Sequence, residues 1–263
     1  MLKYPNIDPI ALQIGPLAIR WYSLAYITGI LAGWWYAGKM NGRAQFINQK
    51  QFDAILSWIV VGLILGGRLG YVIFYNTAYF LHHPVEIFYL WQGGMSFHGG
   101  MTGTVLAIYF FCRKYKMQFF PVMDIAACVS PIGLGLGRLA NFINGELYGR
   151  PTTSAFGMIF PNSDGQPRFP SQLLEASLEG FTMFVVLSVL FWRFNKWKNP
   201  GFLCGAFLVC YGIFRIIAEC LREPDAQLGY FFQYITMGQI LCIPMLLLGI
   251  YLIAWSRRRN VTA

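Results

Sequence analysis

The chain carries little charge for its length. Only 12% of its 263 residues are Asp, Glu, Lys or Arg, whereas soluble domains usually carry about 25%. Apolar residues make up 56% of the sequence, and the mean hydropathy is +0.49. These values argue against an ordinary soluble domain and indicate an all-α polytopic membrane protein. We expect a single integral membrane domain over residues 1–263.

The chain also lacks the signatures of common catalytic and metal sites. Its six cysteines form no CxxC pair and lie within apolar runs, which indicates packed thiols rather than a disulfide framework or a metal site. There are only three histidines, and no Gly-x-Ser-x-Gly, Walker or His-Glu-x-x-His motif is present. We therefore expect no cofactor and no metal, and a nucleophile supplied by a substrate. Residues 1–16 lack the continuous apolar run of a cleavable signal peptide.

Several segments approach the roughly 20 apolar residues that a helix needs to cross a bilayer. The predicted spans are residues 19–38, 54–75, 95–112, 121–142, 172–192, 201–221 and 234–255. The sequence therefore predicts about seven transmembrane helices.

Basic residues gather in alternate connections between these spans. The clusters are Lys39, Arg43 and Lys50; Arg113, Lys114 and Lys116; Arg193, Lys196 and Lys198; and Arg257, Arg258 and Arg259. By the positive-inside rule, the C-terminus is cytoplasmic and the N-terminus lies outside. The connections at about 76–94, 143–171 and 222–233 then form a small external face. This topology accounts for most of the net charge of +9 without any need for nucleic acid.

Polar residues interrupt the fourth span near its predicted outer end. Arg138, Asn141, Asn144 and Glu146 follow a glycine-spaced apolar stretch. Such groups cost free energy in hydrocarbon unless they pair with one another or hold a ligand. The glycine spacing fits close helix packing and ligand approach equally well, and Asn144-Gly145 predicts a turn.

A polar stripe also runs along the sixth span. Tyr211, Arg215, Glu219 and Arg222 recur at four, four and three residues, which places them on one helix face. An Arg215–Glu219 ion pair within the helix is expected. It leaves the other two residues of the stripe facing a polar cavity.

The predicted topology brings three arginines to similar depths in the outer part of the bilayer. Arg68, Arg138 and Arg215 converge there, with too few acids nearby to neutralise them all. Because guanidinium groups form forks that match phosphate, we infer an anionic head-group site. Residues Gln172, Glu175 and Glu179 share one face of the fifth span, where we expect them to balance the arginines rather than to catalyse.

Two further titratable residues have alternative interpretations. His98 lies between two glycine pairs, where an isolated histidine would bond turn carbonyls. It is nevertheless the imidazole best placed to act as a base near neutral pH. Asp124 lies near the predicted cytoplasmic end of the fourth span, where we expect an interfacial charge.

Residues 137–150 (GRLANFINGELYGR) closely resemble the signature of the prolipoprotein diacylglyceryl transferase family. The resemblance continues, in the family's order, through nearly the whole chain. The further matches are residues 66–71, 93–100, 170–173 and 211–219, then Arg222-x-Pro-Asp225 and Met237-Gly-Gln239. Departures occur at Ala140, Tyr148 and Leu174, and none removes a charged group. The connection at 151–169 is short, which leaves the size of any external head domain open.

The resemblance implies a bacterial inner-membrane enzyme with its active site toward the outer side. Such an enzyme moves the diacylglyceryl group of phosphatidylglycerol onto the lipobox cysteine of preprolipoproteins and releases glycerol 1-phosphate. Its partners would be phosphatidylglycerol, the lipobox signal peptide and membrane lipids, and nothing in the sequence demands more than a monomer. The family residues carried over are Tyr22, His98, Arg138, Asn141, Glu146, Gly149, Arg215 and Glu219.

We assign roles within this set as hypotheses. Arg138 and Arg215 stabilise the leaving phosphate, with Asn141 and Tyr22 as neutral donors. The base that activates the thiol is His98, Glu146 or the arginine field alone. The lipid itself is expected to contact Arg138, Asn141, Gly149, Arg215, Glu219 and Arg68.

A lipid or anion transporter is the alternative function, because it would also gather arginines around an anion. Transporters more often show paired repeats and a binding site at the membrane midplane. Neither feature is visible in this sequence. A purely structural scaffold would not need convergent charges within the membrane.

Overall fold

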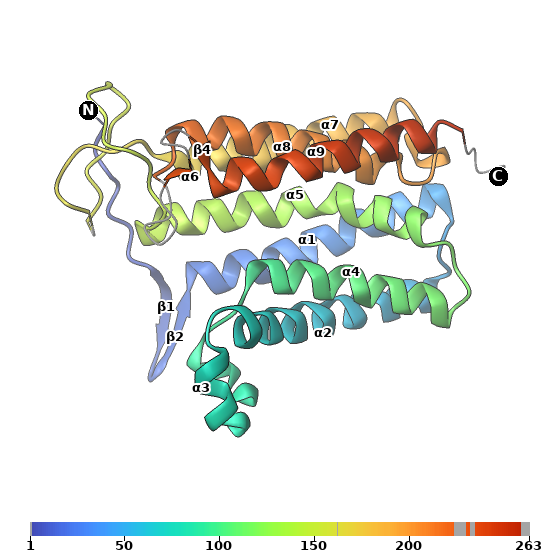
Figure 1. The fold of residues 1–263 in the computed structure, drawn as a ribbon, viewed down its shortest axis with the longest axis horizontal. Helices are drawn as coiled ribbons and strands as arrows, with labels where there is room; N and C mark the ends of the chain where they lie inside the picture. The colour runs from blue at the N-terminus through green and yellow to red at the C-terminus, as the bar shows by residue number, and fades with distance from the viewer. Residues whose placement is uncertain (1, 162, 224–229, 232–234, 259–263) are drawn as a thin grey trace. The chain divides into compact units, whose positions relative to one another are not determined.

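Long helices dominate the computed structural model, which describes residues 2–161, 163–223, 230–231 and 235–258 (Figure 1). Six of them are α1 (Trp21–Ala44), α2 (Gln49–Phe74), α4 (Phe97–Lys114), α5 (Phe119–Asn144), α8 (Phe202–Leu221) and α9 (Met237–Ser256). A seventh helical segment is continuous from α6 (Ser171–Glu175) through a π-helical stretch (Ala176–Thr182) to α7 (Met183–Trp192).

Five of these segments are long and apolar enough to cross a membrane. They are α2, α5, α8, the segment Ser171–Trp192, and residues Gly238–Ser256 of α9. The expectation of a helical multi-pass membrane protein is therefore confirmed. The other two predicted spans correspond to α1 and α4, whose crossing of the membrane stays a prediction.

The helices divide into two compact units, one formed by residues 1–40 and 124–263 and the other by residues 41–123. In the second unit, α2 packs against α4 through facing glycines. A Cβ atom on Gly62 would lie 2.5 Å from the carbonyl oxygen of Gly103, and one on Gly66 would collide with the carbonyl oxygen of Gly99. Glycines four residues apart on one face let the two backbones approach closely. The connection between these helices contains α3 (Thr77–His82) and the short 3₁₀ helices Pro84–Phe88 and Leu90–Gln92.

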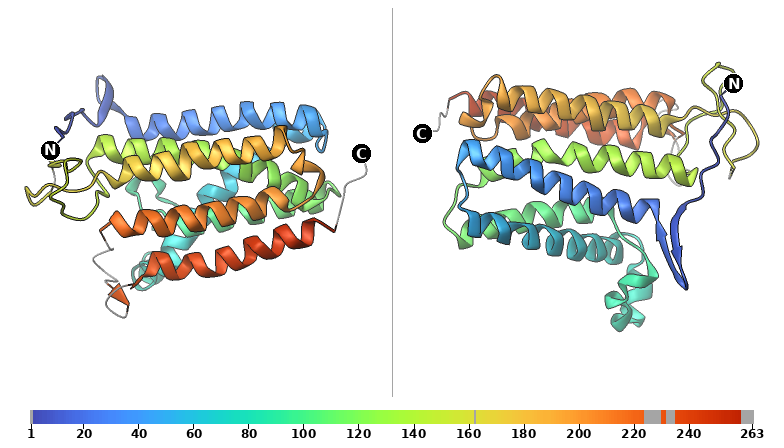
Figure 2. Two further views of the ribbon diagram at one scale, coloured as in Figure 1. Left: turned by 90° about the horizontal axis from the view of Figure 1, so that it is seen from above. Right: turned by 180° about the vertical axis from the view of Figure 1, so that it is seen from behind.

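Close glycine contacts recur in the first unit. Gly135 of α5 faces Gly180, so that a Cβ atom on Gly135 would lie 3.1 Å from the Cα atom of Gly180. Gly29 of α1 approaches Gly133 in the same way, at 3.2 Å. Figure 2 shows α5 beside the segment Ser171–Trp192. Close packing therefore accounts for the glycine at position 135. Cβ atoms on Gly133 and Gly137, in contrast, would meet no described atom within 4 Å.

Two small hairpins were not anticipated from the sequence. Strands β1 (Ile10–Ile14) and β2 (Leu17–Arg20) pair antiparallel, with Ile14 opposite Leu17, and β2 leads directly into α1 (Figure 2). Strands β3 (Tyr230–Phe231) and β4 (Ile235–Thr236) pair just before α9. The predicted outer connection at 222–233 is described only in part. Pro224 and Asp225 of its motif, and Arg259 of the C-terminal basic cluster, lie outside the described residues.

Asp124 corrects one expectation from the sequence. It is not an interfacial charge, because its side chain is only 1% exposed. Its carboxylate accepts hydrogen bonds of 2.7 Å from the backbone N–H groups of Gly201 and Cys204. These N–H groups open α8 and lack partners within that helix, and a helix N-terminus favours a negative charge. Asp124 therefore links α5 to the start of α8.

Candidate active site

The end of α5 orients the carboxylate of Glu146. The helix ends at Asn144, and Gly145 adopts a φ of +66°, which confirms the predicted turn. The turn brings Glu146 back against the helix, where its Oε1 atom accepts hydrogen bonds from Asn141 Nδ2 at 2.8 Å and Asn144 Nδ2 at 3.2 Å. Gln172 also donates to the backbone oxygen of Glu146, at 2.7 Å. Two side-chain amides thus hold the exposed carboxylate of Glu146, and a third holds its backbone.

Arg138 lies one turn before this arrangement and faces the segment that starts at Ser171. Its Nε atom is 2.7 Å from Oε2 of Glu175, and its Nη2 atom is 3.6 Å from Oε2 of Glu179. Both glutamates are fully buried, whereas the Arg138 side chain is 17% exposed. The guanidinium group therefore keeps one side open while its other side is held by carboxylates.

Arg215 of α8 contacts the same two glutamates, and together these residues form a cluster of arginines and glutamates. Its Nη2 atom lies 2.5 Å from Oε1 of Glu219, which confirms the ion pair expected within the helix. Its Nη1 atom lies 3.3 Å from Oε2 of Glu175 and 3.7 Å from Oε1 of Glu179. Arginines from two helices consequently share the same pair of acids.

The number of acids in this cluster corrects another expectation. Three glutamates lie within 4 Å of three guanidinium groups, so the predicted shortage of acids around Arg138 and Arg215 is wrong. The glutamates are Glu175, Glu179 and Glu219, and the arginines are Arg138, Arg215 and Arg222. Glu175 and Glu179 lie on the fifth predicted span, and both were expected to balance the charge of the arginines. Their ion pairs with Arg138 and Arg215 confirm that expectation.

The helix changes its winding between the two buried glutamates. An α-helix advances about 3.6 residues per turn, and a π-helix, with its i→i+5 hydrogen bonds, advances more. Glu175 ends α6 and Glu179 lies within the π-helical stretch. The two carboxylates are four residues apart, so they lie on one side of the helix and both reach the arginines. Such π segments occur often at functional sites.

Thr236 is a residue of the cluster that the sequence reasoning missed. Its hydroxyl donates a 2.8 Å hydrogen bond to Oε2 of Glu219, and its side chain is almost fully buried. The hydroxyl oxygen of Thr236 also accepts a hydrogen bond from the backbone N–H of Gln239. In return, the side chain of Gln239 accepts one from the backbone N–H of Thr236. This reciprocal pair is a capping box. The Thr-x-x-Gln spacing was visible in the sequence, but its link to Glu219 was not.

The connection after α5 closes over the end of α8. Arg150 donates to the backbone oxygens of Arg222, at 2.8 Å, and of Glu219, at 3.1 Å, which satisfies carbonyls that the helix end leaves open. Gly149 packs so closely that a Cβ atom would collide with the carbonyl oxygen of Leu221. The need for glycine at this position therefore follows from packing.

Arg168 holds the outer part of this connection together. It pairs with Asp164 at 2.9 Å and with Glu223, and it donates to the carbonyl of Gly149 at 3.2 Å. Its guanidinium group also lies over the ring of Tyr148, 5.1 Å from the centroid. The hydrogen bonds and charge of Arg168 lower the pKa of the Asp164 carboxyl group.

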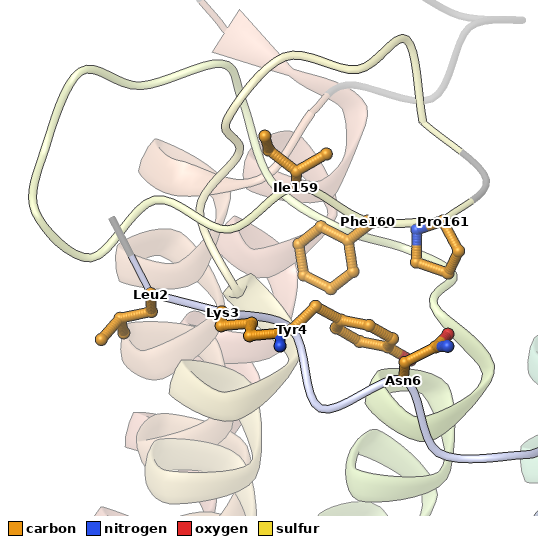
Figure 3. Close-up of a pocket in the computed structure, with 7 residues that line it drawn as sticks. All are labelled: Leu2, Lys3, Tyr4, Asn6, Ile159, Phe160 and Pro161. Carbon is orange, nitrogen blue, oxygen red and sulfur yellow. The ribbon is translucent and has the colours of Figure 1, made fainter.

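The N-terminal segment packs against the end of α5. The hydroxyl of Tyr4 contacts the backbone oxygens of Phe142 and Ile143, each at 2.9 Å, and its ring packs against Phe142 and Phe160. Burial raises the pKa of Tyr4, so the hydroxyl stays protonated as a donor. A cavity of about 300 Å³ opens beside it (Figure 3). The described residues that line it are all outside the cluster of arginines and glutamates.

Tyr22 lies in the first turn of α1. Its ring centroid is 5.2 Å from that of Tyr26, and its hydroxyl lies within electrostatic range of Glu146 and Arg138. Tyr22, Arg138, Asn141, Glu146, Gly149, Arg215 and Glu219 therefore all belong to one compact unit.

Arg68 and His98 belong to the other unit. The guanidinium group of Arg68 is buried and donates to five backbone oxygens of the connection before α4. These belong to Glu86, Ile87, Tyr89, Gly93 and Gly94, at 2.5 to 3.3 Å. The observed contacts of Arg68 are therefore those of a residue that orders this connection.

His98 lies in the first turn of α4 and is exposed. Its ring makes an edge contact with Phe97. Within the described ranges of the chain, the imidazole makes no hydrogen bond, and no group of three His, Cys, Asp or Glu residues could hold a metal ion.

Apolar helices that carry a buried cluster of arginines and glutamates define a multi-pass membrane protein with an ionised site at one end of its helices. Comparison with known proteins identifies the family within this class. The model of the prolipoprotein diacylglyceryl transferase family matches residues 9–255, and the chain belongs to that family. The resemblance inferred from the motifs is thereby confirmed.

Proteins with the name phosphatidylglycerol–prolipoprotein diacylglyceryl transferase are similar to the chain over nearly its full length. The proteins from Rickettsia akari (strain Hartford) and Rickettsia felis are each 52% identical over 256 residues, which cover 97% of this chain and 99% of the relative. The protein from Rickettsia bellii (strain OSU 85-389) is 49% identical over 262 residues, which cover 99% of this chain and 100% of the relative.

Proposed function

We propose that the chain transfers the sn-1,2-diacylglyceryl group of phosphatidylglycerol to the lipobox cysteine of preprolipoproteins and releases glycerol 1-phosphate. The observation that carries this proposal is the near full-length identity with transferases of that name. The arginine cluster supports it from chemistry, because buried guanidinium groups with remaining donors suit a lipid phosphate.

The chemical step makes one bond and breaks another. The cysteine thiolate attacks C3 of the diacylglyceryl group, a C–S bond forms, and the C3–O bond to phosphate breaks. The electron pair goes to the phosphate oxygen, so negative charge grows there as the diester becomes a monoester. Fixed donors aimed at that oxygen lower the barrier. Arg138 and Arg215 take this role, with Asn141 and Tyr22 as neutral donors.

Gly149 and Glu219 complete the proposed lipid site. Gly149 lets the connection after α5 lie close against α8, and Glu219 orients Arg215 through their ion pair. Arg68 orders the connection before α4, so we do not assign its guanidinium group to the phosphate.

The thiol has an ordinary pKa near 8.5, so its proton needs a base or a positive field to leave. We propose His98 as the base because its imidazole is exposed. Glu146, whose carboxylate two amide groups orient, and the positive field of the arginines alone are the alternatives. Substituting His98 by Gln while most of the turnover survives in vesicles would refute the assignment to His98.

The proposed topology has seven membrane-spanning helices, which adds α1 and α4 to the five candidate spans. The distribution of basic residues supports a cytoplasmic C-terminus and an N-terminus outside. In a bacterial inner membrane, this arrangement puts Arg138 and Glu146 toward the outer side. The protein would act there as a monomeric membrane domain of 263 residues.

The test uses purified protein in vesicles that contain phosphatidylglycerol, with a lipobox peptide as acceptor. Mass spectrometry should detect a diacylglyceryl thioether with the wild-type protein and peptide. The product should be absent with a Cys→Ser peptide and should form far more slowly with the Arg138→Ala variant. Glycerol phosphate without thioether would indicate a lipid hydrolase. Lipid binding with neither product would indicate a transporter.

A further inference from the structure

One oxygen atom of Glu175 is shared by three guanidinium groups. Its Oε2 atom lies 2.7 Å from Nε of Arg138, 3.3 Å from Nη1 of Arg215 and 3.9 Å from Nη1 of Arg222. The other oxygen, Oε1, is buried and has no hydrogen-bond partner in the part of the chain that the structure describes. A carboxylate beside a single arginine usually offers both oxygens to the fork. The Oε2 atom of Glu175 instead lies within 4 Å of three guanidinium groups, while Oε1 contacts none of them by hydrogen bond.

Glu175 is more deeply buried than the arginines that it contacts. Its side chain is 1% exposed, whereas those of Arg138 and Arg215 are 17% and 14% exposed. The Nη groups of Arg138 make no hydrogen bond within the described residues, and the Nη2 atom lies 3.6 Å from the carboxylate of Glu179. An incoming phosphate can therefore take these donors while Glu175 keeps its contact with Nε.

We propose that Glu175 is a resident counter-anion that gives the site its preference for a phosphodiester over a phosphomonoester. This role rests on the proposed function and deepens it. Without an anion, the converging guanidinium groups would repel one another and separate. Glu175 holds them together before the lipid arrives, so it acts as a positioning and specificity-determining residue and not as a catalytic one.

The preference follows from charge. A phosphodiester such as phosphatidylglycerol carries one negative charge, whereas a phosphomonoester carries about 1.5 to 2 at neutral pH. The fixed charge of Glu175 therefore repels the monoester product more strongly than the diester substrate. The same carboxylate that orders the arginines would then help to expel glycerol 1-phosphate after each turnover.

The direct test is the Glu175→Gln variant, which keeps the shape of the side chain and removes its charge. We expect glycerol 1-phosphate to become a stronger product inhibitor by about tenfold or more, because repulsion between charges is strong at a partly buried site. The KM for phosphatidylglycerol should change by a smaller factor. A Glu175→Asp variant, which keeps the charge but withdraws it by one methylene group, should show a smaller increase in product inhibition.

Glu223→Gln is the matched control. It removes the same charge from a side chain that is 45% exposed and pairs with Arg168, outside the cluster. Its product inhibition should equal that of the wild-type protein. Equal product inhibition in the wild-type protein and a folded Glu175→Gln variant would overturn the proposal. If that variant does not fold, unchanged inhibition in Glu175→Asp overturns it instead.

A binding measurement separates this proposal from the proposed function. Thermal stabilisation of the purified protein in detergent, by glycerol 1-phosphate and by phosphatidylglycerol, reports affinity without turnover. A wild-type protein that forms no thioether would contradict the proposed function. The ratio of the two affinities, compared between wild type and Glu175→Gln, would still test Glu175.

Discussion

Thr236 donates a 2.8 Å hydrogen bond to the carboxylate of Glu219, and this bond ties the start of α9 to the ion pair of Arg215. The same hydroxyl caps α9 by accepting from the backbone N–H of Gln239. One buried oxygen thus connects a helix terminus to a charged residue of the candidate site. A change at Thr236 should affect both the stability of α9 and the orientation of Glu219.

The substitution Thr236→Val should therefore lower both stability and transfer activity. It keeps the shape of the side chain but leaves one oxygen of Glu219 and the N–H of Gln239 without a partner. We expect a loss of about 1–3 kcal/mol in the free energy of unfolding, measured by thermal unfolding in detergent. Thr236→Ser keeps the hydroxyl and should stay close to wild type. Equal stability of the Val and Ser variants would contradict the role of this hydrogen bond.

Replacing Arg138 by Ala should cost about 10²–10³ in kcat, or about 3 kcal/mol, because the leaving phosphate loses a fixed donor. Arg138→Lys keeps the charge but not the planar fork, so we expect it to recover only part of the rate. Turnover is measured by thioether formation in vesicles. Arg113→Ala, at the end of α4 and exposed, is the matched control and should retain its activity. Full activity in Arg138→Ala would exclude Arg138 from the chemical step.

Arg68 should prove to be an organiser of the connection before α4. Arg68→Ala removes all five side-chain hydrogen bonds to residues 86–94, and we expect faster hydrogen exchange there and a loss of at least about 2 kcal/mol in stability. The free guanidinium ion, added at millimolar concentration, should restore part of the protection, because the carbonyl groups remain convergent. Unchanged exchange in residues 86–94 would show that the connection is held by other contacts.

The pair of Asp164 and Arg168 predicts a local response to acid. The folded pKa of Asp164 is lowered by Arg168, so the pair contributes stability above the unfolded pKa of about 3.9. That contribution is lost as the pH falls through the folded pKa. We expect the backbone hydrogen bonds between Met158 and Arg168 to open faster in hydrogen exchange under those acidic conditions.

The Asp164→Asn variant provides the control for this response. It should already open faster at neutral pH and should lack the acid-dependent step, because it has no carboxyl group to titrate. An identical acid response in the variant would assign the effect to another group.

Local spacing accounts for the features that the sequence predicted correctly. Arg215 and Glu219 are four residues apart on a helix, so their ion pair follows from helical geometry alone. Asn144-Gly145 predicted its own turn in the same way. The acids of the fifth span were found because their spacing places them on one face.

Features that depend on backbone groups or on another helix could not be predicted in this way. The partners of Arg68 are carbonyl oxygens, which every residue has and which leave no pattern in the sequence. Asp124 meets N–H groups that lie 77 and 80 residues further along the chain. The predicted excess of arginine came from comparing the depths of residues along the helices, whereas the structure pairs Arg138 and Arg215 with specific carboxylates.

The π-helical stretch has a consequence for how the lipid-facing side of this helix is assigned. A helical wheel drawn with 3.6 residues per turn over Ser171–Trp192 loses its phase between Ala176 and Thr182. Residues from Met183 onward then face a different direction from the one that the wheel assigns to them. Met183 and Leu187 are fully buried, while Phe181 is 71% exposed. In cysteine-labelling or lipid-crosslinking experiments, the lipid-facing side of this helix should therefore be assigned separately for the residues before and after the π-helical stretch.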